Sequence, residues 1–397
     1  MCPMRGRGLD THALIVALLL PGFAAPARAQ TTTLSPYASI SEEIESYAGP
    51  GRASANDLPG QVVRIGLLVP LRGARKAEGD AMVAAAQMAL RDTASQRLSH
   101  GRRVALAVED SSGPSWGMVS NAVIRLMLND DAVAVITSTS AVDTHLCEQV
   151  GNRIGVPVLT LSADATTTQI DIPWIFRIGP SDAQQAQAIT QDMYSVRKLK
   201  NVWLITQHDH DGNRAMDAVR QAASTLGARA PNLVALDTSL LDPESIIRKI
   251  EAESPQAIVI WTNPSTAAIL VHALRIAGVK TLCYLSQDVS SEMHDTSTSE
   301  LTTNGTWTIV GDDEATGNRQ SFAARFRQST GTAPSLVAGE TYDAVILTVH
   351  ALQTTGPNRA RVRDELGKTS NYDEVSGRIS FDREGNNRAT LHLVQLK

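Results

Sequence analysis

The feature that most constrains this chain is an alternation of short aliphatic runs with segments of helical periodicity. Four runs are rich in β-branched residues and nearly continuous: "VVRIGLLVP" (62–70), "RVALAVED" (103–110), "AVAVIT" (132–137) and "VPVLTLS" (156–162). Helix-patterned segments separate them, at residues 78–94, 115–130 and 141–155. Strands buried on both faces have this character, and each parallel pair needs a crossover, usually a helix. The alternation predicts an α/β fold with a parallel sheet.

The same alternation begins again after residue 174. The stretch "WIFRIGPSDAQQAQAI" marks the change, because a strand is followed by a new helix start at Ser181 and Asp182. Further strands are expected at 201–206, 232–238, 256–262 and 281–286, with helices at 213–227, 243–253 and 264–277. The tail predicts helices at 321–331 and 338–355 and a β-hairpin around Glu384, Gly385 and Asn386. The predicted fold class is therefore α/β with two doubly wound parallel-sheet lobes.

The first residues have the pattern of an export signal. Two arginines precede an apolar stretch at residues 13–20, which is too short to span a bilayer. Residues 27–29 read Ala-Arg-Ala, an A-x-A cleavage pattern. We expect a signal peptide at residues 1–29 and a flexible leader, rich in Thr, Ser, Gly and Pro, at residues 30–61. The mature protein is then expected in the periplasm.

Charge and cysteine content exclude some classes of protein. Lys+Arg number 36 and Asp+Glu 41, a net charge of -5, with no basic patch for nucleic acid. Of 3 cysteines, Cys2 leaves with the signal, and Cys147 and Cys283 stand far apart. We expect two separate, mostly buried thiols rather than a disulfide framework.

In an open parallel sheet, ligands collect outside the carboxyl ends of the strands, where helix N-termini offer free N–H groups. Seven polar segments follow predicted strands in this way: Pro70–Asp80, Asp110–Trp116, Thr137–Thr144, Thr160–Thr166, Gln207–Asn213, Thr262–Ser265 and Ser286–Ser290. Taken one by one, such loops often only cap helices with Ser, Thr and Asp. Their repeated placement favours a cleft.

Four stretches of these segments and of the tail resemble a known family. They are "IGLLVPLRG…EGDAMVAAAQMAL", "ITSTSAV…GVPVLTLSADAT", "AGETYDAVILTVHAL" and "SGRISFDREGNNR". Their order and spacing are similar to those of type 1 periplasmic solute-binding proteins, especially the branched-chain amino acid and amide receptors of ABC importers. The resemblance covers about residues 62–397.

The resemblance implies two lobes joined by a three-stranded hinge, with a ligand held between them. Lobe 1 would comprise residues 62–180 plus 309–376, and lobe 2 residues 181–308 plus 377–397. Hydroxyl and N–H donors would bind a ligand carboxylate, and Asp288 would pair with a ligand amine. The expected ligand-binding residues are Glu78, Ser138, Thr139, Ser140, Ala141, Ser162, Ala163, Asp164, Asp211, Thr262, Asn263 and Asp288.

Several of these positions depart from the family pattern. Asp164 stands where the family has a small hydroxyl residue, Ala141 where a serine is common, and Glu78 and Asp211 where aromatic residues are usual. The extra acids favour a cationic or amide-type ligand over a plain aliphatic zwitterion. Three basic residues could reverse this preference if they point inward, or could lie in solvent: Arg72, Arg75 and Lys76.

The stretch "QHDHDGN" at residues 207–213 places four potential metal ligands side by side. On an extended segment His208 and His210 would face the same side, and zinc could use them with a carboxylate. Their spacing matches no closed structural zinc site, so we expect no metal and no cofactor. The preferred interpretation is a ligand-facing loop in which Asp211 touches the ligand. A pH-sensitive contact is the alternative.

The predicted function is capture of a small polar solute, an amino acid, amide or related amine, for delivery to the permease of an ABC importer. The protein is expected to be a monomer and not an enzyme, because G-x-S-x-G, H-E-x-x-H and a Gly-rich phosphate loop are missing from the sequence. A sensory receptor that feeds a signalling partner stays open as an alternative. An exported metal-dependent hydrolase is disfavoured.

Overall fold

The computed structural model describes residues 57–94, 98, 101–113, 116–169, 174–237, 241–288, 305–310, 316–388 and 390–395. The predicted signal peptide and residues 30–56 of the predicted leader lie outside the described residues. The end of the leader is tied to the fold, because Leu58 N donates a hydrogen bond of 2.8 Å to Pro357 O. In the described part of the chain, no helix combines the length and the hydropathy that crossing a bilayer requires.

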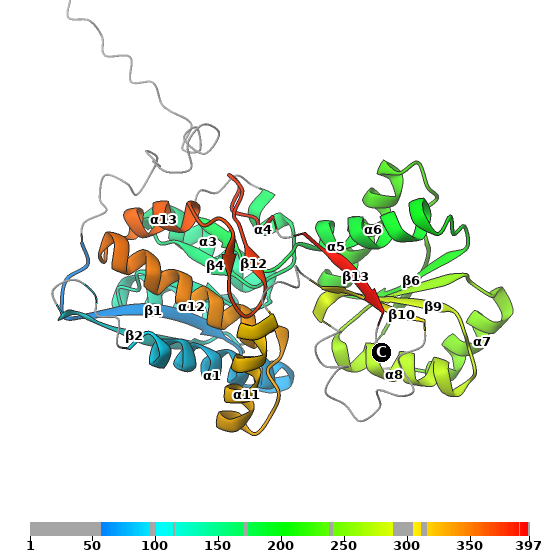
Figure 1. Ribbon diagram of the computed structural model, residues 1–397, viewed down its shortest axis with the longest axis horizontal. Helices are drawn as coiled ribbons and strands as arrows, with labels where there is room; N and C mark the ends of the chain where they lie inside the picture. Colours follow the sequence, from blue (N-terminus) through cyan, green and yellow to red (C-terminus); the bar gives the residue numbers. More distant parts are fainter. Residues whose placement is uncertain are drawn as a thin grey trace, which may run out of the picture. The chain divides into compact units, whose positions relative to one another are not determined.

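The first sheet has five parallel strands in the order β2-β1-β3-β4-β5 (Figure 1). The strands are β1 Val62–Val69, β2 Arg103–Asp110, β3 Ala134–Thr137, β4 Val158–Thr160 and β5 Ile175–Arg177. The helical segments between them are η2 Gly73–Arg75, α1 Lys76–Asp92, α2 Trp116–Ile124, η4 Arg125–Asn129, α3 Ala141–Ile154 and α4 Thr166–Gln169. The predicted alternation is therefore present.

Burial explains why the strands of this sheet read as continuous aliphatic runs. In β1, Ile65 and Leu67 pack in one cluster with Met82 of α1. The neighbouring Leu68 packs in a second cluster with Cys147 of α3. Successive side chains of a strand point to opposite faces, so a strand with helices on both faces is mostly apolar, and in β1 the exposed Arg64 is the one charged residue.

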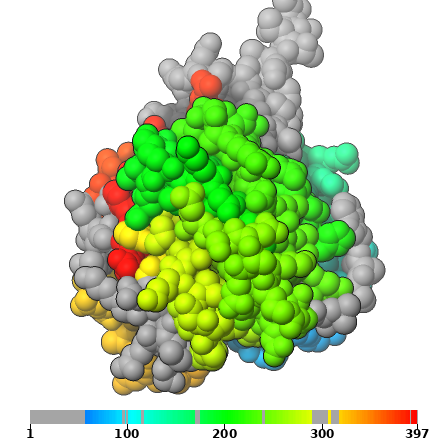
Figure 2. Space-filling model, turned by 90° about the vertical axis from the view of Figure 1, so that its right-hand side faces the viewer, coloured from blue at the N-terminus to red at the C-terminus, as the bar shows by residue number. Residues whose placement is uncertain are grey.

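The second sheet has six strands in the order β13-β10-β9-β8-β6-β7. Its strands are β6 Val202–Gln207, β7 Asn232–Leu236, β8 Ala257–Trp261, β9 Leu282–Leu285, β10 Thr306–Val310 and β13 His392–Gln395. Its helices are α5 Asp182–Thr190, with its continuation η5 Gln191–Val196, α6 His210–Thr225, α7 Pro243–Glu253 and α8 Pro264–Ile276. Figure 2 shows a face formed mainly by these segments, drawn in green and yellow.

The core on each face of the second sheet is built as in the first. On one face, Ile205 and Ile258 pack with Leu270 of α8. On the other face, Leu204 and Val259 pack with Ile189 of α5. Helices lie on both faces of the two sheets, of which the first is parallel and the second is parallel except for β13, and this arrangement confirms the predicted doubly wound α/β class.

The segment after β10 supplies helices to the first sheet and one strand, β13, to the second. The remaining elements are α11 Thr316–Thr330, α12 Leu336–Thr355, α13 Arg359–Gly367, β11 Tyr372–Asp373 and β12 Arg378–Ile379. Residues of α12 share the first cluster with β1 and α1. The short helix α13 was not among the predicted elements. The chain thus passes between the two sheets after β5, after β10 and before β13, whereas the exact lobe limits stay a prediction.

The C-terminal hairpin is present around the predicted turn, but it is shorter than predicted and β13 is not part of it. A tight turn is present, because Asp382 N donates to Asn386 O at 2.9 Å and Phe381 bridges Asn387. The strand β13 instead pairs antiparallel with β10. This pairing brings Leu393 against the second core, whereas a longer hairpin would remove it from that core.

Glycines let the helices α1 and α6 begin close to the ends of the strands that precede them, β1 and β6. A Cβ at Gly79 of α1 would lie 1.9 Å from Pro70 O, and a Cβ at Gly212 of α6 would lie 2.0 Å from Gln207 O. No other residue fits at either position without moving the backbone. The two glycines therefore set how close the first turns of α1 and α6 lie to the carboxyl ends of the strands.

Candidate functional site

The loop after β3 begins at Ser138 and leads into α3. Ser140 caps the helix, since its hydroxyl accepts from Asp143 N at 3.2 Å. Ser138 Oγ donates to Asp143 Oδ2 at 2.9 Å, and both residues are buried. Burial raises the pKa of Asp143, even though Ser138 and the charge of Arg75 act against this rise. Ala141, the first residue of α3, is buried and contributes no polar group.

Glu78 accepts hydrogen bonds from Thr139, one of the residues expected to bind a ligand carboxylate. Its Oε1 accepts hydrogen bonds from Thr139 N at 3.1 Å and Thr139 Oγ1 at 2.9 Å. Arg75 pairs with the same carboxylate, through its Nε at 2.8 Å and a terminal nitrogen at 2.7 Å. The Thr139 donors are thus already engaged by an acid of the chain itself.

Arg75 connects this loop electrostatically to the second sheet. Its guanidinium also donates to Thr139 Oγ1 at 2.8 Å and Ser138 Oγ at 3.3 Å. Partial burial alone would lower the pKa of Arg75, but Glu78, Asp143 and Asp211 raise it. Asp211 belongs to α6, so its charge acts on a residue that precedes α1.

The turn after β4 positions a buried carboxylate. Ser162 Oγ accepts from Asp164 N at 3.2 Å, and Ala163 O accepts from Asp182 N at 2.7 Å. Asp164 is only 6% exposed. Burial would raise the pKa of Asp164, but hydrogen bonds from Thr166 and His210 and the charge of Arg214 hold it below its ordinary value.

The stretch "QHDHDGN" is the start of α6 rather than an extended loop. Asp209 caps the helix by accepting from Gly212 N at 2.8 Å, and the helix begins at His210, three residues earlier than predicted. The segment is therefore not extended, and the arrangement in which His208 and His210 would face the same side is not present. His210 Nε2 lies 2.8 Å from Asp164 Oδ2, and Arg214 Nε lies 3.6 Å from Asp164 Oδ1.

Thr262 and Asn263 fix the ends of two strands of the second sheet. Asn263 caps α8 by accepting from Thr266 N at 2.9 Å. Its backbone N and its Nδ2 both donate to Gln207 Oε1 at 2.6 Å, which joins the ends of β6 and β8. Thr262 Oγ1 donates to Asn263 O at 3.1 Å. The bond from Thr266 N is the one expected of a helix cap, and the bonds to Gln207 hold the two strand ends together.

The structure groups the predicted residues into two sets. Residues 138–141 and 162–164 follow neighbouring strands of the first sheet, together with Glu78. Asp211, Thr262, Asn263 and the exposed Asp288 follow strands of the second sheet. Asp164 and His210 join the two sets. Whether these residues bind a ligand stays a prediction.

Sequence reasoning missed three residues of this region: Asp143, His210 as a partner of Asp164, and Glu340 of α12. Burial raises the pKa of Glu340 well above its ordinary value, and the Asp288 and Asp343 carboxylates raise it further. The sequence signal was that the largely apolar helix segment "AGETYDAVILTVHAL" contains two acids, Glu340 and Asp343. Within the part of the chain that the structure describes, no group of three or more His, Cys, Asp or Glu side chains could hold a metal ion.

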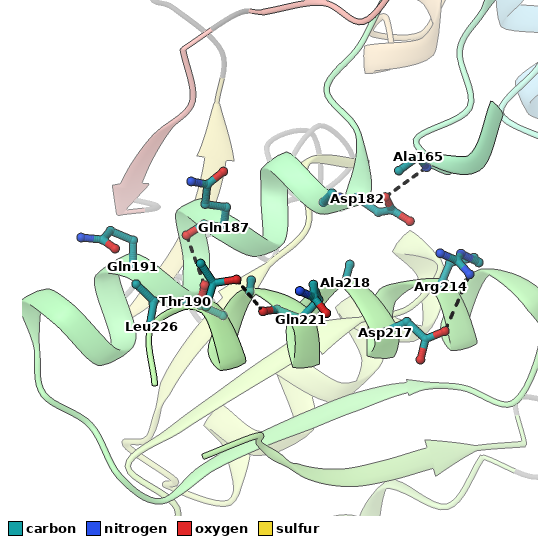
Figure 3. Close-up of a pocket in the computed structure, with 13 residues that line it drawn as sticks. Ala165, Asp182, Gln187, Thr190, Gln191, Arg214, Asp217, Ala218, Gln221 and Leu226 are labelled. Carbon is teal, nitrogen blue, oxygen red and sulfur yellow. Dashed lines mark hydrogen bonds and ion pairs between the residues drawn. The ribbon is translucent and has the colours of Figure 1, made fainter. Parts of the chain in front are cut away.

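A cavity of about 460 Å³ lies beside these residues, between α5 and α6 (Figure 3). Its walls are mostly alanines and glutamines, and Asp182 and Arg214 lie at the end near Ala165 (Figure 3). Asp182 Oδ1 accepts from Ala165 N at 3.1 Å, whereas its buried Oδ2 has no hydrogen-bond partner among the residues that the structure describes. Burial and the nearby Asp164 raise the pKa of Asp182 to about 6.

Two doubly wound sheets whose strand ends bring polar loops together define a solute-binding protein of the type 1 periplasmic class. A family model described as "Periplasmic binding protein" matches residues 62–397, and the chain belongs to that family. The predicted family and the predicted solute-binding function are thereby confirmed. Members of this family are substrate-binding proteins of the periplasm.

Individual relatives are distant in sequence. An "Amino acid binding protein" of Pseudomonas aeruginosa is 23% identical over 338 residues, 84% of this chain and 89% of the relative. The substrate-binding protein LivJ of Streptococcus pneumoniae, solved with isoleucine, has a TM-score of 0.71 and 19% identity, covering 85% of this chain and 96% of LivJ.

A third relative was solved with a different kind of ligand. The solute-binding protein of an ABC transporter from Rhodopseudomonas palustris BisB5, in complex with 3,4-dihydroxy benzoic acid, has a TM-score of 0.72 and 16% identity. The match covers 85% of this chain and 93% of that chain. The fold is thus shared by proteins solved with chemically different small molecules.

Proposed function

We propose that the protein captures a small polar solute that carries an amine or amide group and delivers it to the permease of an ABC importer. The solute would contact the strand ends of both sheets. The observation that carries this proposal is the 2.8 Å contact between Asp164 and His210, which follow strands of different sheets. A ligand that bound both sets of loops would stabilise a closed arrangement by a hinge motion.

The charge of the loops supports a ligand with a cationic or amide group. Four carboxylates stand among the polar loops: Glu78, Asp143, Asp164 and Asp211. The cations found with them are already paired, Arg75 with Glu78 and Arg214 with Asp164 and Asp217. A carboxylate ligand would add charge to an acidic surface, whereas an N–H donor would lower the electrostatic free energy.

Further parts of the proposal come from the family and from the sequence. The protein would be exported by the predicted signal peptide, would act as a monomer and would catalyse no reaction. The expected partners are the solute and a membrane permease. Each of these expectations depends on the proposed role in import.

A thermal-shift screen followed by calorimetry tests the proposal. The compounds are L-leucine, L-glutamine, L-lysine, L-arginine, acetamide, urea, putrescine and agmatine. A ligand at about 100 times its dissociation constant adds about 2.7 kcal/mol to the unfolding free energy, which is readily seen as a higher Tm. No stabilisation by any of them would contradict the proposed ligand class. Uptake of the identified solute by cells with and without the protein then tests the role in import.

A further inference from the structure

The cavity between α5 and α6 has a polar end and a more apolar end. Figure 3 shows Asp182 and Arg214 at one end and Leu226 at the other. Its volume of about 460 Å³ falls in the range of about 300–1,000 Å³ that is usual for sites that bind small molecules. Among the described residues that line it, none belongs to the predicted ligand-binding set. The cavity is therefore a feature that solute capture at the strand ends does not use.

Asp182, at the start of α5, is fixed through one of its two carboxylate oxygens. Its Oδ1 accepts hydrogen bonds from Ala165 N at 3.1 Å and from Ala183 N at 2.7 Å. The residue is only 5% exposed, and its Oδ2 has no hydrogen-bond partner in the described part of the chain. A buried acceptor without a partner costs free energy. Asp182 thus presents an oxygen for an N–H donor that the described residues do not supply.

Arg214 of α6 has unused donors at the same end of the cavity. Its ion-pair contacts, 3.6 Å to Asp164 Oδ1 and 3.7 Å to Asp217 Oδ2, are longer than hydrogen bonds. Its Nε is buried and makes no hydrogen bond with any residue that the structure describes. A guanidinium carries five N–H donors. Arg214 can therefore donate to an acceptor oxygen that lies next to the carboxylate of Asp182.

Beyond this end, the cavity offers mostly aliphatic surface. The two threonines in its lining use their hydroxyls within their own helices, since Thr190 Oγ1 donates to Ala186 O at 2.8 Å and Thr225 Oγ1 donates to Gln221 O at 3.0 Å. The glutamines in the lining are exposed, so their amide groups can stay in water. The remaining aliphatic lining residues beyond the polar end are Ala183, Ala218, Ala222 and Leu226.

We infer that the cavity between α5 and α6 is a second binding site, which takes a small aliphatic carboxamide. The amide group of such a molecule has an N–H for Asp182 and a carbonyl oxygen for Arg214, and its chain would lie along the alanines. The charged residues that line the cavity are two acids and one base, Asp182, Asp217 and Arg214. A carboxylate head group would be repelled by the acids, and an ammonium head group would leave Arg214 without an acceptor.

A crystal soaked with 6-bromohexanamide locates the site directly. We expect an anomalous bromine peak between α5 and α6, on the side of Leu226, with the amide group at Asp182 and Arg214. Calorimetry with hexanamide, hexanoate and hexylamine then tests the head group. Hexanamide should bind wild type at least about fivefold more tightly than the other two compounds, because it alone satisfies both buried groups.

Two variants and a control test the cavity walls. Ala222→Leu fills part of the cavity and should weaken hexanamide binding about tenfold or more. Ser224→Leu introduces the same side chain at an exposed position of α6 that does not line the cavity, and should change the dissociation constant less than about twofold. Arg214→Met keeps an unbranched side chain and removes the donors. It should weaken hexanamide about fivefold without weakening hexylamine, so it serves as the test if Ala222→Leu does not fold.

The outcomes separate this inference from the proposed function. A bromine peak only at the strand ends, or an unchanged dissociation constant in Ala222→Leu, would overturn the second site and leave solute capture intact. Equal binding of the three head groups would overturn the assignment to a carboxamide. If hexanamide does not bind wild type, the second site is also overturned, whereas solute capture is decided by its own screen.

Discussion

Asp164 Oδ2 and His210 Nε2 lie 2.8 Å apart and connect loops that follow strands of two different sheets. The carboxylate is almost fully buried, whereas the histidine side chain is 57% exposed. Asp164 also accepts from Thr166 N at 2.9 Å, so the first loop holds it in place and the contact depends on the position of α6. A change in the relative position of the two loops would have to break this contact.

We expect His210→Ala to weaken ligand binding about two- to fivefold, because an exposed ion pair contributes at most about 1 kcal/mol. The contribution of the Asp164 charge to ligand binding should be present above the ordinary pKa of about 4. It should be lost at lower pH, since the pKa of Asp164 is held below that value. Calorimetry with the compound identified by screening measures the effect. His208→Ala, at an exposed histidine two residues earlier, is the control, and an equal effect there would contradict the assignment.

Replacement of Glu78 should change ligand preference. Glu78→Ala removes the acid that occupies Thr139 N and Thr139 Oγ1, and it leaves Arg75 without its main partner. We expect binding of L-leucine, whose carboxylate could replace that of Glu78, to strengthen about tenfold, since a charge-assisted hydrogen bond contributes about 1.5 kcal/mol or more. Asp80→Ala on the same helix removes an exposed acid paired with Lys76 and should leave the dissociation constant unchanged.

The pH dependence of stability should report on Asp182. Its pKa is raised to about 6, so the folded state resists ionisation that the unfolded chain accepts near pH 4. The wild type should lose up to about 3 kcal/mol of unfolding free energy as the pH rises from 4 to 7. Asp182→Asn keeps the accepting Oδ1 and should not show this loss. Denaturant unfolding at pH 4, 5.5 and 7 measures the difference, and parallel curves for the two proteins would contradict the prediction.

Two glycine substitutions should have opposite effects on stability. Gly212→Ala places a Cβ 2.0 Å from Gln207 O and 2.7 Å from Thr206 Oγ1, so the first turn of α6 must move. We expect a loss of about 2 kcal/mol or more of unfolding free energy, together with weaker ligand binding. Gly117→Ala in α2 meets no atom within 4 Å and should stabilise the protein by about 0.5–1 kcal/mol. Urea unfolding of both variants provides the measurement.

Local patterns were sufficient to predict most of the architecture. The run "VVRIGLLV" predicted β1 because helices on both faces leave no room for polar residues in a central strand. Gly155 ended α3 as expected, with a φ of 70 that favours glycine. Buried Cys147 and Cys283 are free thiols in different clusters, as the composition and spacing indicated.

Contacts between distant residues could not be predicted from the sequence. The pairing of β13 with β10, the contact of Asp164 with His210 and the position of Glu340 beside Gly179 all join segments that are far apart in the chain. Periodicity reports which face of an element is buried, but it does not report which other element lies against that face. The hydrogen bonds of Thr139 were missed for the same reason, since its partner Glu78 lies on α1, far from Thr139 in the chain.

The order of segments in the first sheet has a consequence for how the chain acquires its structure. The strands of that sheet end at Arg177, yet one of its faces is packed against α12, which begins only at Leu336. A nascent chain that has reached residue 300 can pair β1 with β3 and pack α1 against Ile65 and Leu67, but it lacks the cover that α12 gives to the same cluster. Completion of the N-terminal sheet therefore waits for the C-terminal helices. Such long-range dependence is typical of slow folding, and apolar surface that stays uncovered in the meantime favours aggregation.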